Sequence, residues 1–156
     1  MALDDAAFRQ TMGSFVSGVT VVTTVHEDIR YGMTVSSFTS LSLHPQLLLV
    51  CLTSTLPTYL AIVQSQHFGV SILAADQAAV SQQFASRQVD KFAGVAWHAG
   101  STGLPLISDA CATIECRVSA IHPGGDHAIV VGEIIAAQTS DRAPLVYARG
   151  AYHQLA

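Results

Sequence analysis

The sequence predicts a mainly β domain in which an antiparallel β-barrel carries inserted helices. About six or seven runs rich in β-branched residues recur at the spacing of hairpins. Beyond one helix at the start of the chain, helical patterns follow only the third and the fourth of these runs, whereas a doubly wound parallel sheet has a helix after nearly every strand. The 156 residues hold no repeat or linker, so we expect one domain over residues 1–156 with one core.

Three segments have helical patterns. The first covers residues 3–15, where apolar residues recur at helical spacing after two aspartates, and we expect this helix to end near Gly18. The second is expected at 56–66. The third is expected at 76–86, where Asp76 stands at the position of a capping residue.

The other periodic segments are typical of strands. The run at 46–53 is apolar throughout, which predicts that both of its faces are covered, one by the barrel interior and one by a helix or a second subunit. A turn at 122–126 separates the two longest runs. The predicted strands cover residues 18–25, 31–39, 46–53, 67–73, 110–121, 127–138 and 145–153.

The composition favours an oligomer. Half of the residues (50%) are hydrophobic and only 12% are charged, compared with roughly 25% charged residues in a typical soluble domain. A large apolar interface between subunits would cover the excess. With no apolar run long enough to span a membrane and no signal sequence, we expect a cytoplasmic protein without a membrane partner. The net charge of −4 and the scattered basic residues argue against nucleic acid as a partner.

The sequence lacks the motifs of several common functional classes. The chain has no GxGxxG after a strand, no GxxxxGK[ST] and no GxSxG, which removes the main support for dinucleotide-fold, P-loop and hydrolase functions. Three cysteines without a CxxC pattern indicate buried reduced thiols. Seven histidines never form HxxxH, so we expect no metal site.

Small hydroxyl residues gather near the helix expected at 56–66. Ser54 and Thr55 precede it and Pro57 stands early in it, an order that suits a capped helix start. The N–H groups and the dipole at that start favour an anion, and Ser54, Thr55 and Thr58 could supply further donors. The spacing alone is equally compatible with a Ser/Thr-rich sheet edge, but the helix start favours a phosphate-bearing ligand.

The chain resembles the flavin reductase-like domain family, the small NAD(P)H:flavin oxidoreductase components of two-component flavin-dependent monooxygenases. The resemblance extends nearly end to end and rests on FVSGVTVVTT, GMTVSSFTSLSLHPQLLLVCL, DKFAGVAWHAGSTGLPLI, ATIECRV and GGDHAIVVGEI in family order. It implies a homodimeric, FMN-binding split β-barrel with flavin near the subunit boundary. It also implies that NADH or NADPH reduces FMN or FAD, and that the reduced flavin goes to a partner oxygenase by diffusion.

The resemblance also assigns residues to the flavin and the pyridine nucleotide. Thr34 to Ser37 would lie along the flavin ring and ribityl chain, with Cys51 and Leu52 as the next wall. Hydroxyl groups near the helix start and one lysine would reach the phosphate, two phenylalanines would pack near the flavin, and Arg149 and Tyr152 would help to hold the nucleotide. The full set of cofactor-binding candidates is Thr34, Val35, Ser36, Ser37, Cys51, Leu52, Ser54, Thr55, Thr58, Phe84, Lys91, Phe92, Arg149 and Tyr152.

One histidine is the catalytic candidate. His127, in GGDHAIVVGEI, matches a family histidine placed close to the nicotinamide and the reactive side of the flavin. The chain differs from commoner members in Ser36, where Asn is frequent, and in Gln88 and Val89, where a more Gly-rich loop is frequent. A non-catalytic FMN-binding protein for storage or sensing is the main alternative. An oxidase of the pyridoxamine-phosphate type would require more basic residues than this chain has.

Overall fold

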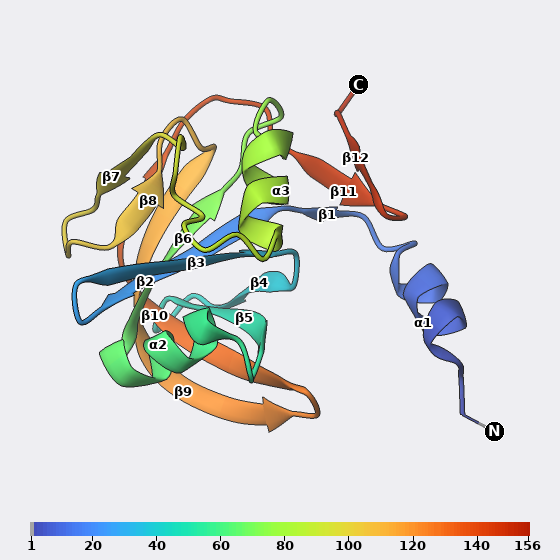
Figure 1. The fold of residues 1–156 in the computed structure, drawn as a ribbon, viewed down its shortest axis with the longest axis horizontal. Helices are drawn as coiled ribbons and strands as arrows, with labels where there is room; N and C mark the ends of the chain where they lie inside the picture. Colours follow the sequence, from blue (N-terminus) through green and yellow to red (C-terminus); the bar gives the residue numbers. More distant parts are fainter. Residues whose placement is uncertain (1) are drawn as a thin grey trace.

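A seven-stranded antiparallel sheet forms the body of the protein (Figure 1), in the order β3-β2-β6-β9-β10-β5-β4. The computed structural model describes residues 2–156. The strands of this sheet are β2 Thr20–His26, β3 Ile29–Val35, β4 Phe38–Ser42, β5 Leu47–Thr53, β6 His67–Ile72, β9 Ala112–Gly124 and β10 His127–Thr139. β3 and β4 stand at the two ends of this order, and the predicted mainly β, antiparallel class is confirmed.

Two smaller sheets and three helices complete the fold. The sheets join β1 Ser17–Gly18 to the hairpin of β11 Val146–Ala148 and β12 Ala151–His153, and β7 Trp97–Ala99 to β8 Pro105–Ile107. The helices are α1 Asp5–Met12, α2 Pro57–Ser65 and α3 Ala78–Ala85. Among residues 2–156, no helix has the length and apolar character needed to cross a membrane.

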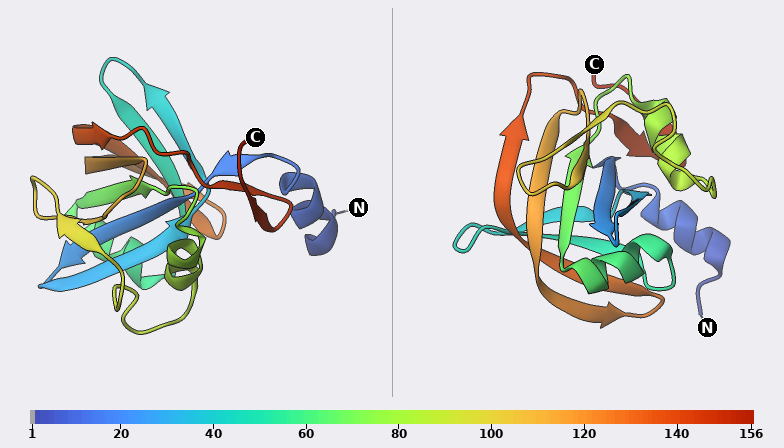
Figure 2. Two further views of the ribbon diagram at one scale, coloured as in Figure 1. Left: turned by 90° about the horizontal axis from the view of Figure 1, so that it is seen from above. Right: turned by 60° about the vertical axis from the view of Figure 1, so that its left-hand side comes forward.

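The core has two clusters on opposite faces of the sheet, because the neighbours Val22 and Val21 of β2 belong to one cluster each. Its central side chains include Val50, Leu52 and Phe68, all wholly buried. In β5 buried and half-buried residues alternate, so the expectation that both faces are covered holds for one face, while Leu49 and Cys51 on the other stay partly exposed in the single chain. Figure 2 shows the hairpin of β4 and β5 projecting from the body.

One glycine allows this core to close. A Cβ atom at Gly132 in β10 would lie 2.5 Å from Cζ of Phe68 and 2.9 Å from Cβ of Cys116. Because Phe68 is wholly buried, its ring has no free space to move into. The aromatic ring therefore packs directly on the strand backbone.

Several predicted boundaries were wrong for local reasons. The first helix ends at Met12, not near Gly18, and Ser36 and Ser37 break the run at 31–39 into β3 and β4. The connection from Ala93 to Gly103 contains β7, which no periodic pattern indicated. The last predicted strand is a hairpin that turns at 149–150.

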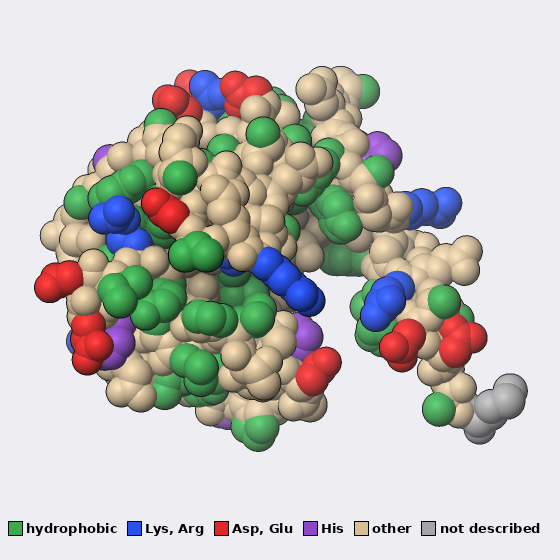
Figure 3. All heavy atoms as spheres, viewed as in Figure 1, with side chains coloured by type: hydrophobic (Ala, Val, Ile, Leu, Met, Phe, Trp, Pro, Cys, Tyr) green, Lys and Arg blue, Asp and Glu red, His purple; other side chains and the backbone are tan. Residues whose placement is uncertain are grey.

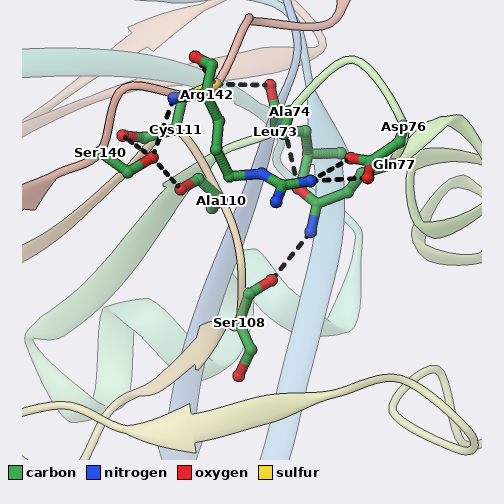
Figure 4. Close-up of polar contacts among 9 residues, drawn as sticks. All are labelled: Leu73, Ala74, Asp76, Gln77, Ser108, Ala110, Cys111, Ser140 and Arg142. Carbon is green, nitrogen blue, oxygen red and sulfur yellow. Dashed lines mark hydrogen bonds and ion pairs between the residues drawn. The ribbon is translucent and has the colours of Figure 1, made fainter.

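Asp76 does not cap the third helix. Gln77 stands at the N-cap, and Arg142 Nη2 donates to both Asp76 oxygens at 2.7 and 2.6 Å (Figure 4). The hydrogen bond from Arg142 lowers the pKa of the Asp76 carboxyl. In the same cluster the Cys111 thiol donates to the Arg142 carbonyl at 3.2 Å. Together these contacts fasten the segment before β11 to the segment after β6.

A buried carboxylate holds the β7–β8 hairpin against β9. Glu115 is 4% exposed and accepts hydrogen bonds from the backbone and hydroxyl groups of Ser101 and Thr102. Burial raises the pKa of the Glu115 carboxyl, but the hydroxyl and backbone donors of Thr102 and Ser101 outweigh burial, so its pKa lies below the ordinary value. The ionised form is the one that this turn stabilises.

Glu115→Gln should therefore lower the free energy of unfolding by about 1–3 kcal/mol near pH 7, because four donors lose a charged acceptor and the amide nitrogen leaves two of them facing a donor. The folded-state pKa is depressed, so the contribution is full above the ordinary value of 4.5 and is lost as the pH falls through the folded value. Urea titrations from pH 7 to pH 3 should show the two proteins converging at low pH. Glu133→Gln, which breaks an exposed pair with Arg117, should cost no more than about 1 kcal/mol, and an equal loss in both variants would contradict the assignment.

Candidate functional site

A cleft of about 950 Å³ separates α1 from the body of the protein, and we call it the His127 cleft. Figure 3 shows α1 as a separate lobe beside it. On the body side it is lined by Ser36 and Ser37 at the corner between β3 and β4, and by Asp126 and His127 at the start of β10. On the other side it is lined by apolar residues of α1 and the following loop, namely Phe8, Met12 and Phe15.

His127 is held between two side chains. Its Nδ1 lies 2.7 Å from Asp126 Oδ1, and its Nε2 lies 3.3 Å from Thr53 Oγ1. A carboxylate can only accept, so Nδ1 carries the proton donated to Asp126. Nε2 lies at hydrogen-bond distance from the Thr53 hydroxyl, which can donate to it or accept from it. The hydrogen bond to His127 lowers the pKa of Asp126. The side chain of His127 is 43% exposed, so it remains accessible from the cleft.

The serine corner is fixed to the neighbouring strand. Ser37 Oγ donates to the carbonyl of Cys51 at 2.8 Å, and the Cys51 N–H donates to the Ser37 carbonyl at 3.0 Å. Both Ser36 and Ser37 are exposed. The corner therefore presents polar groups to the His127 cleft from a backbone that cannot easily shift.

A second cleft, of about 290 Å³, crosses the edge of β3 between the start of α2 and the loop at 88–92, and we call it the Lys91 cleft. Lys91 Nζ donates to the carbonyls of Gly32 at 3.1 Å and Phe84 at 3.0 Å. Burial lowers the pKa of Lys91. Among residues 2–156 no carboxylate lies within ion-pair distance of it, so two carbonyls are all that offset the buried charge.

The start of α2 faces the same cleft with unused donors. Its N-cap is Leu56, so no side chain caps the helix, and the expected capping by Ser54 or Thr55 is wrong. Thr58 is 4% exposed and lines the cleft, and in the described part of the chain its hydroxyl has no hydrogen-bond partner. An uncapped helix start, a hydroxyl that is open to the cleft and a cation without a carboxylate together make a site for an anion.

Gly32 brings the lysine and the third helix together. A Cβ atom at Gly32 would lie 2.6 Å from Cε1 of Phe84. Phe84 is wholly buried, and its ring meets Phe92 edge-on with the centroids 5.0 Å apart. Of these two predicted flavin contacts, Phe92 lines the Lys91 cleft and Phe84 belongs to the core.

The other predicted site residues lie around the two clefts. Ser54 Oγ donates to the Asp126 carbonyl at 3.1 Å, and Thr55 is exposed. Thr34 Oγ1 donates to the Ser81 carbonyl at 2.6 Å, and Tyr152 Oη lies 2.7 Å from Ser81 Oγ. The rest are Val35 and Leu52, buried in the core, and Arg149, which lines a separate hollow near α1.

Three polar groups at the site were not among the sequence-based candidates. Asp126 directly precedes His127, so its place in the turn could have indicated a hydrogen-bond partner. Thr53 reaches His127 only through the pairing of β5 with β10. Arg30 stacks its guanidinium 4.7 Å from the Trp97 ring centroid beside the Lys91 cleft. Within residues 2–156 no group of three or more His, Cys, Asp or Glu could hold a metal ion.

Comparisons with known proteins all find flavin reductases or the reductase components of monooxygenases. The model of the family described as flavin reductase like domain matches residues 12–156. The chain is 44% identical over 150 residues to the reductase component of 4-nitrophenol 4-monooxygenase/4-nitrocatechol 2-monooxygenase from Rhodococcus opacus, covering 96% of this chain and 80% of that protein. It is 38% identical over 146 residues to an FMN reductase (NADH) of Agrobacterium fabrum, covering 94% and 83%. Its fold matches the NADH:FAD oxidoreductase of Streptomyces globisporus, solved in complex with NAD and FAD fragments, with a TM-score of 0.95, 37% identity and coverage of 98% and 93%.

Thr58→Val tests whether the unpaired hydroxyl serves a ligand. Because the hydroxyl makes no hydrogen bond to the described residues and is open to the cleft, an apolar group of the same shape should leave the unfolding free energy of the ligand-free protein unchanged or raise it by up to about 1 kcal/mol. The same change at Thr23, whose buried hydroxyl donates to the Pro105 carbonyl, should instead cost about 1–3 kcal/mol. Urea denaturation measures both, and a comparable loss at Thr58 would mean that its hydroxyl supports the fold.

Proposed function

Because the chain belongs to the flavin reductase like domain family, we propose that it passes hydride from NADH or NADPH to FMN or FAD and releases the reduced flavin to a separate oxygenase. The Rhodococcus and Agrobacterium relatives are named as a monooxygenase reductase component and as an NADH-dependent FMN reductase. The observation that carries the proposal is the pairing of His127 and Asp126 in a large cleft, together with an anion site at Thr58 and Lys91.

The two clefts suit a single extended ligand. The strand β3 and the corner after it contribute Met33 to the Lys91 cleft and Ser36 to the His127 cleft. Thr53 bonds to His127, and Leu56 and Thr58, a few residues later, line the Lys91 cleft. We therefore place the flavin ring in the His127 cleft and the phosphate at Thr58 and Lys91. Ser54 and Thr55 lie along the chain between these positions and are proposed as further donors.

When bound, the flavin would supply the acceptor for the hydride that the nicotinamide donates. The protein contributes alignment: Ser36 and Ser37 hold one edge of the ring from a rigid corner. The apolar residues of α1 exclude water from the opposite side of the cleft. Lys91 and the start of α2 fix the phosphate, so that the ring cannot slide along the cleft.

His127 acts on the nicotinamide side. Because its Nδ1–H donates a hydrogen bond to Asp126, the imidazole ring has a fixed orientation. We propose that His127 orients the nicotinamide carboxamide or holds the proton that accompanies reduction. Asp126 is a positioning residue, since it acts through the imidazole. Arg149 and Tyr152 are proposed to hold the nucleotide from the side of β11 and β12.

The activity is tested by NADH and NADPH oxidation with purified protein and added FMN, FAD or riboflavin. His127→Asn should slow reduction of the flavin by about 10²–10⁴-fold, the usual contribution of a positioned acid–base group, while FMN affinity changes little. Stopped-flow absorbance follows the reduction step directly. His122→Asn, an exposed histidine on β9, is the matched control and should reduce flavin at the wild-type rate; a wild-type rate in His127→Asn would make that residue structural.

We also propose that the protein is a homodimer. Large apolar side chains are exposed on α1 and the loop after it, including Phe15 at 78%, and on the β4–β5 hairpin, including Leu43 at 68%. Clusters of large exposed apolar side chains mark interaction sites on proteins. A second copy covering these surfaces would close the His127 cleft on the side of α1.

The dimer is expected at micromolar concentration by multi-angle light scattering. Leu43→Asp should weaken it, with the dissociation constant rising at least about tenfold, because a charge would be buried at an apolar contact. Leu155→Asp adds the same charge at an exposed apolar residue near the C-terminus and should leave the mass unchanged. A monomeric wild-type protein would refute the proposal.

A further inference from the structure

The Lys91 cleft extends beyond the groups that would hold one phosphate. Thr58 and Lys91 would hold that phosphate and define the inner part of the cleft; we call the remaining lining, from the edge of β3, the start of α2 and the loop at 88–92, its outer part. This outer part contains Arg30 and three exposed apolar side chains, Ile29 at 54%, Leu56 at 40% and Val89 at 104%. FMN, which ends at its single phosphate, would leave this outer part of the cleft uncovered.

Arg30 is a second cation held beside the first. Its guanidinium lies 4.7 Å from the ring centroid of Trp97 and 5.7 Å from that of Phe92, so two aromatic rings restrict its position. Arg30 and Gly32 stand two residues apart in β3, on the same face and about 7 Å apart along the strand. Lys91 binds the Gly32 carbonyl, so the two cations flank one stretch of the cleft.

The Lys91 cleft is positively charged although the chain as a whole is negatively charged. The protein has a net charge of −4, yet no acidic residue is among the described residues that line the cleft. Neither Arg30 nor Lys91 has a carboxylate partner within residues 2–156. Two cations without local counter-ions favour a ligand whose negative charge is spread over two adjacent phosphates.

The edge of β3 offers backbone groups to a flat polar ring. The Gly32 carbonyl accepts from Lys91, so the backbone groups of Gly32 point away from β2. Backbone groups point the same way at every second residue of a strand, so those of Arg30 also face the open edge. An N–H and a C=O side by side match the ring nitrogen and amino group of adenine, and the neighbouring apolar side chains match its faces.

We infer that the outer Lys91 cleft binds the AMP half of FAD, with the diphosphate between Lys91 and Arg30 and the adenine against Val89 and the edge of β3. FAD is then the preferred flavin of this chain. The inference rests on the proposed function, because it requires that the first phosphate occupies the inner part of the cleft. FMN binds by the inner part alone and gains nothing from Arg30 or Val89.

Binding of riboflavin, FMN and FAD to the full chain, followed by quenching of flavin fluorescence, tests the inference. The wild-type protein should bind FAD at least about tenfold more tightly than FMN, the effect of one stacked base or its equivalent. Val89→Asp should reduce the ratio of the two affinities by at least about tenfold, because it replaces the apolar contact with the adenine by a carboxylate. Leu155→Asp, which adds the same charge outside the cleft, should keep the wild-type ratio.

A competition experiment on the wild-type protein avoids any effect on folding. Adenosine 5′-monophosphate should displace FAD and leave bound riboflavin in place, since only FAD reaches the outer cleft. Equal affinity for FAD and FMN, or a Val89→Asp variant with an unchanged ratio, would overturn this inference and leave the reductase function standing. Failure to bind any flavin, with no NADH or NADPH oxidation, would overturn both.

Discussion

The antiparallel pairing of β5 with β10 is the constraint on which the candidate site depends. It sets Thr53 opposite His127, and it brings the turn before β10 against the segment that leads into α2, where the Ser54 N–H donates to the Asp126 carbonyl at 3.1 Å. A slip of one residue would turn every side chain of β5 to the opposite face. Burial of Leu48, Val50 and Leu52 on one face forbids that slip. The hydrophobic core thus fixes the geometry of the polar cleft.

The anion site is built from groups that the fold leaves incompletely satisfied. The start of α2 has no side-chain cap, Thr58 has no partner among the described residues, and Lys91 is half buried beside carbonyls alone. The missing cap and the half-buried lysine cost stability in the free protein. A negatively charged ligand would satisfy all three at once, which explains why such costs are tolerated at a binding site.

The sequence predicted local structure better than long-range contacts. Two hairpins are identified from short segments, because strand and turn preferences act locally. One begins with the β-branched run that forms β2, and the other has the turn residues at 122–126. Asp76 was expected to cap a helix, but it bonds to Arg142, a residue far along the chain. Thr53 and Arg30 were missed for the same reason: their partners are set by sheet pairing and aromatic packing, which no spacing reveals.

The close contact between Gly32 and Phe84 constrains the order in which these two residues can be substituted. A side chain at this position would collide with the ring of Phe84, whose carbonyl is one of the two that hold Lys91. A mutation at 32 is therefore harmful unless Phe84 has first become smaller, and a smaller residue at 84 leaves a cavity until 32 is filled. Either single substitution lowers the stability of the protein, while the double substitution need not. Residues 32 and 84 should therefore change together, or not at all, during evolution.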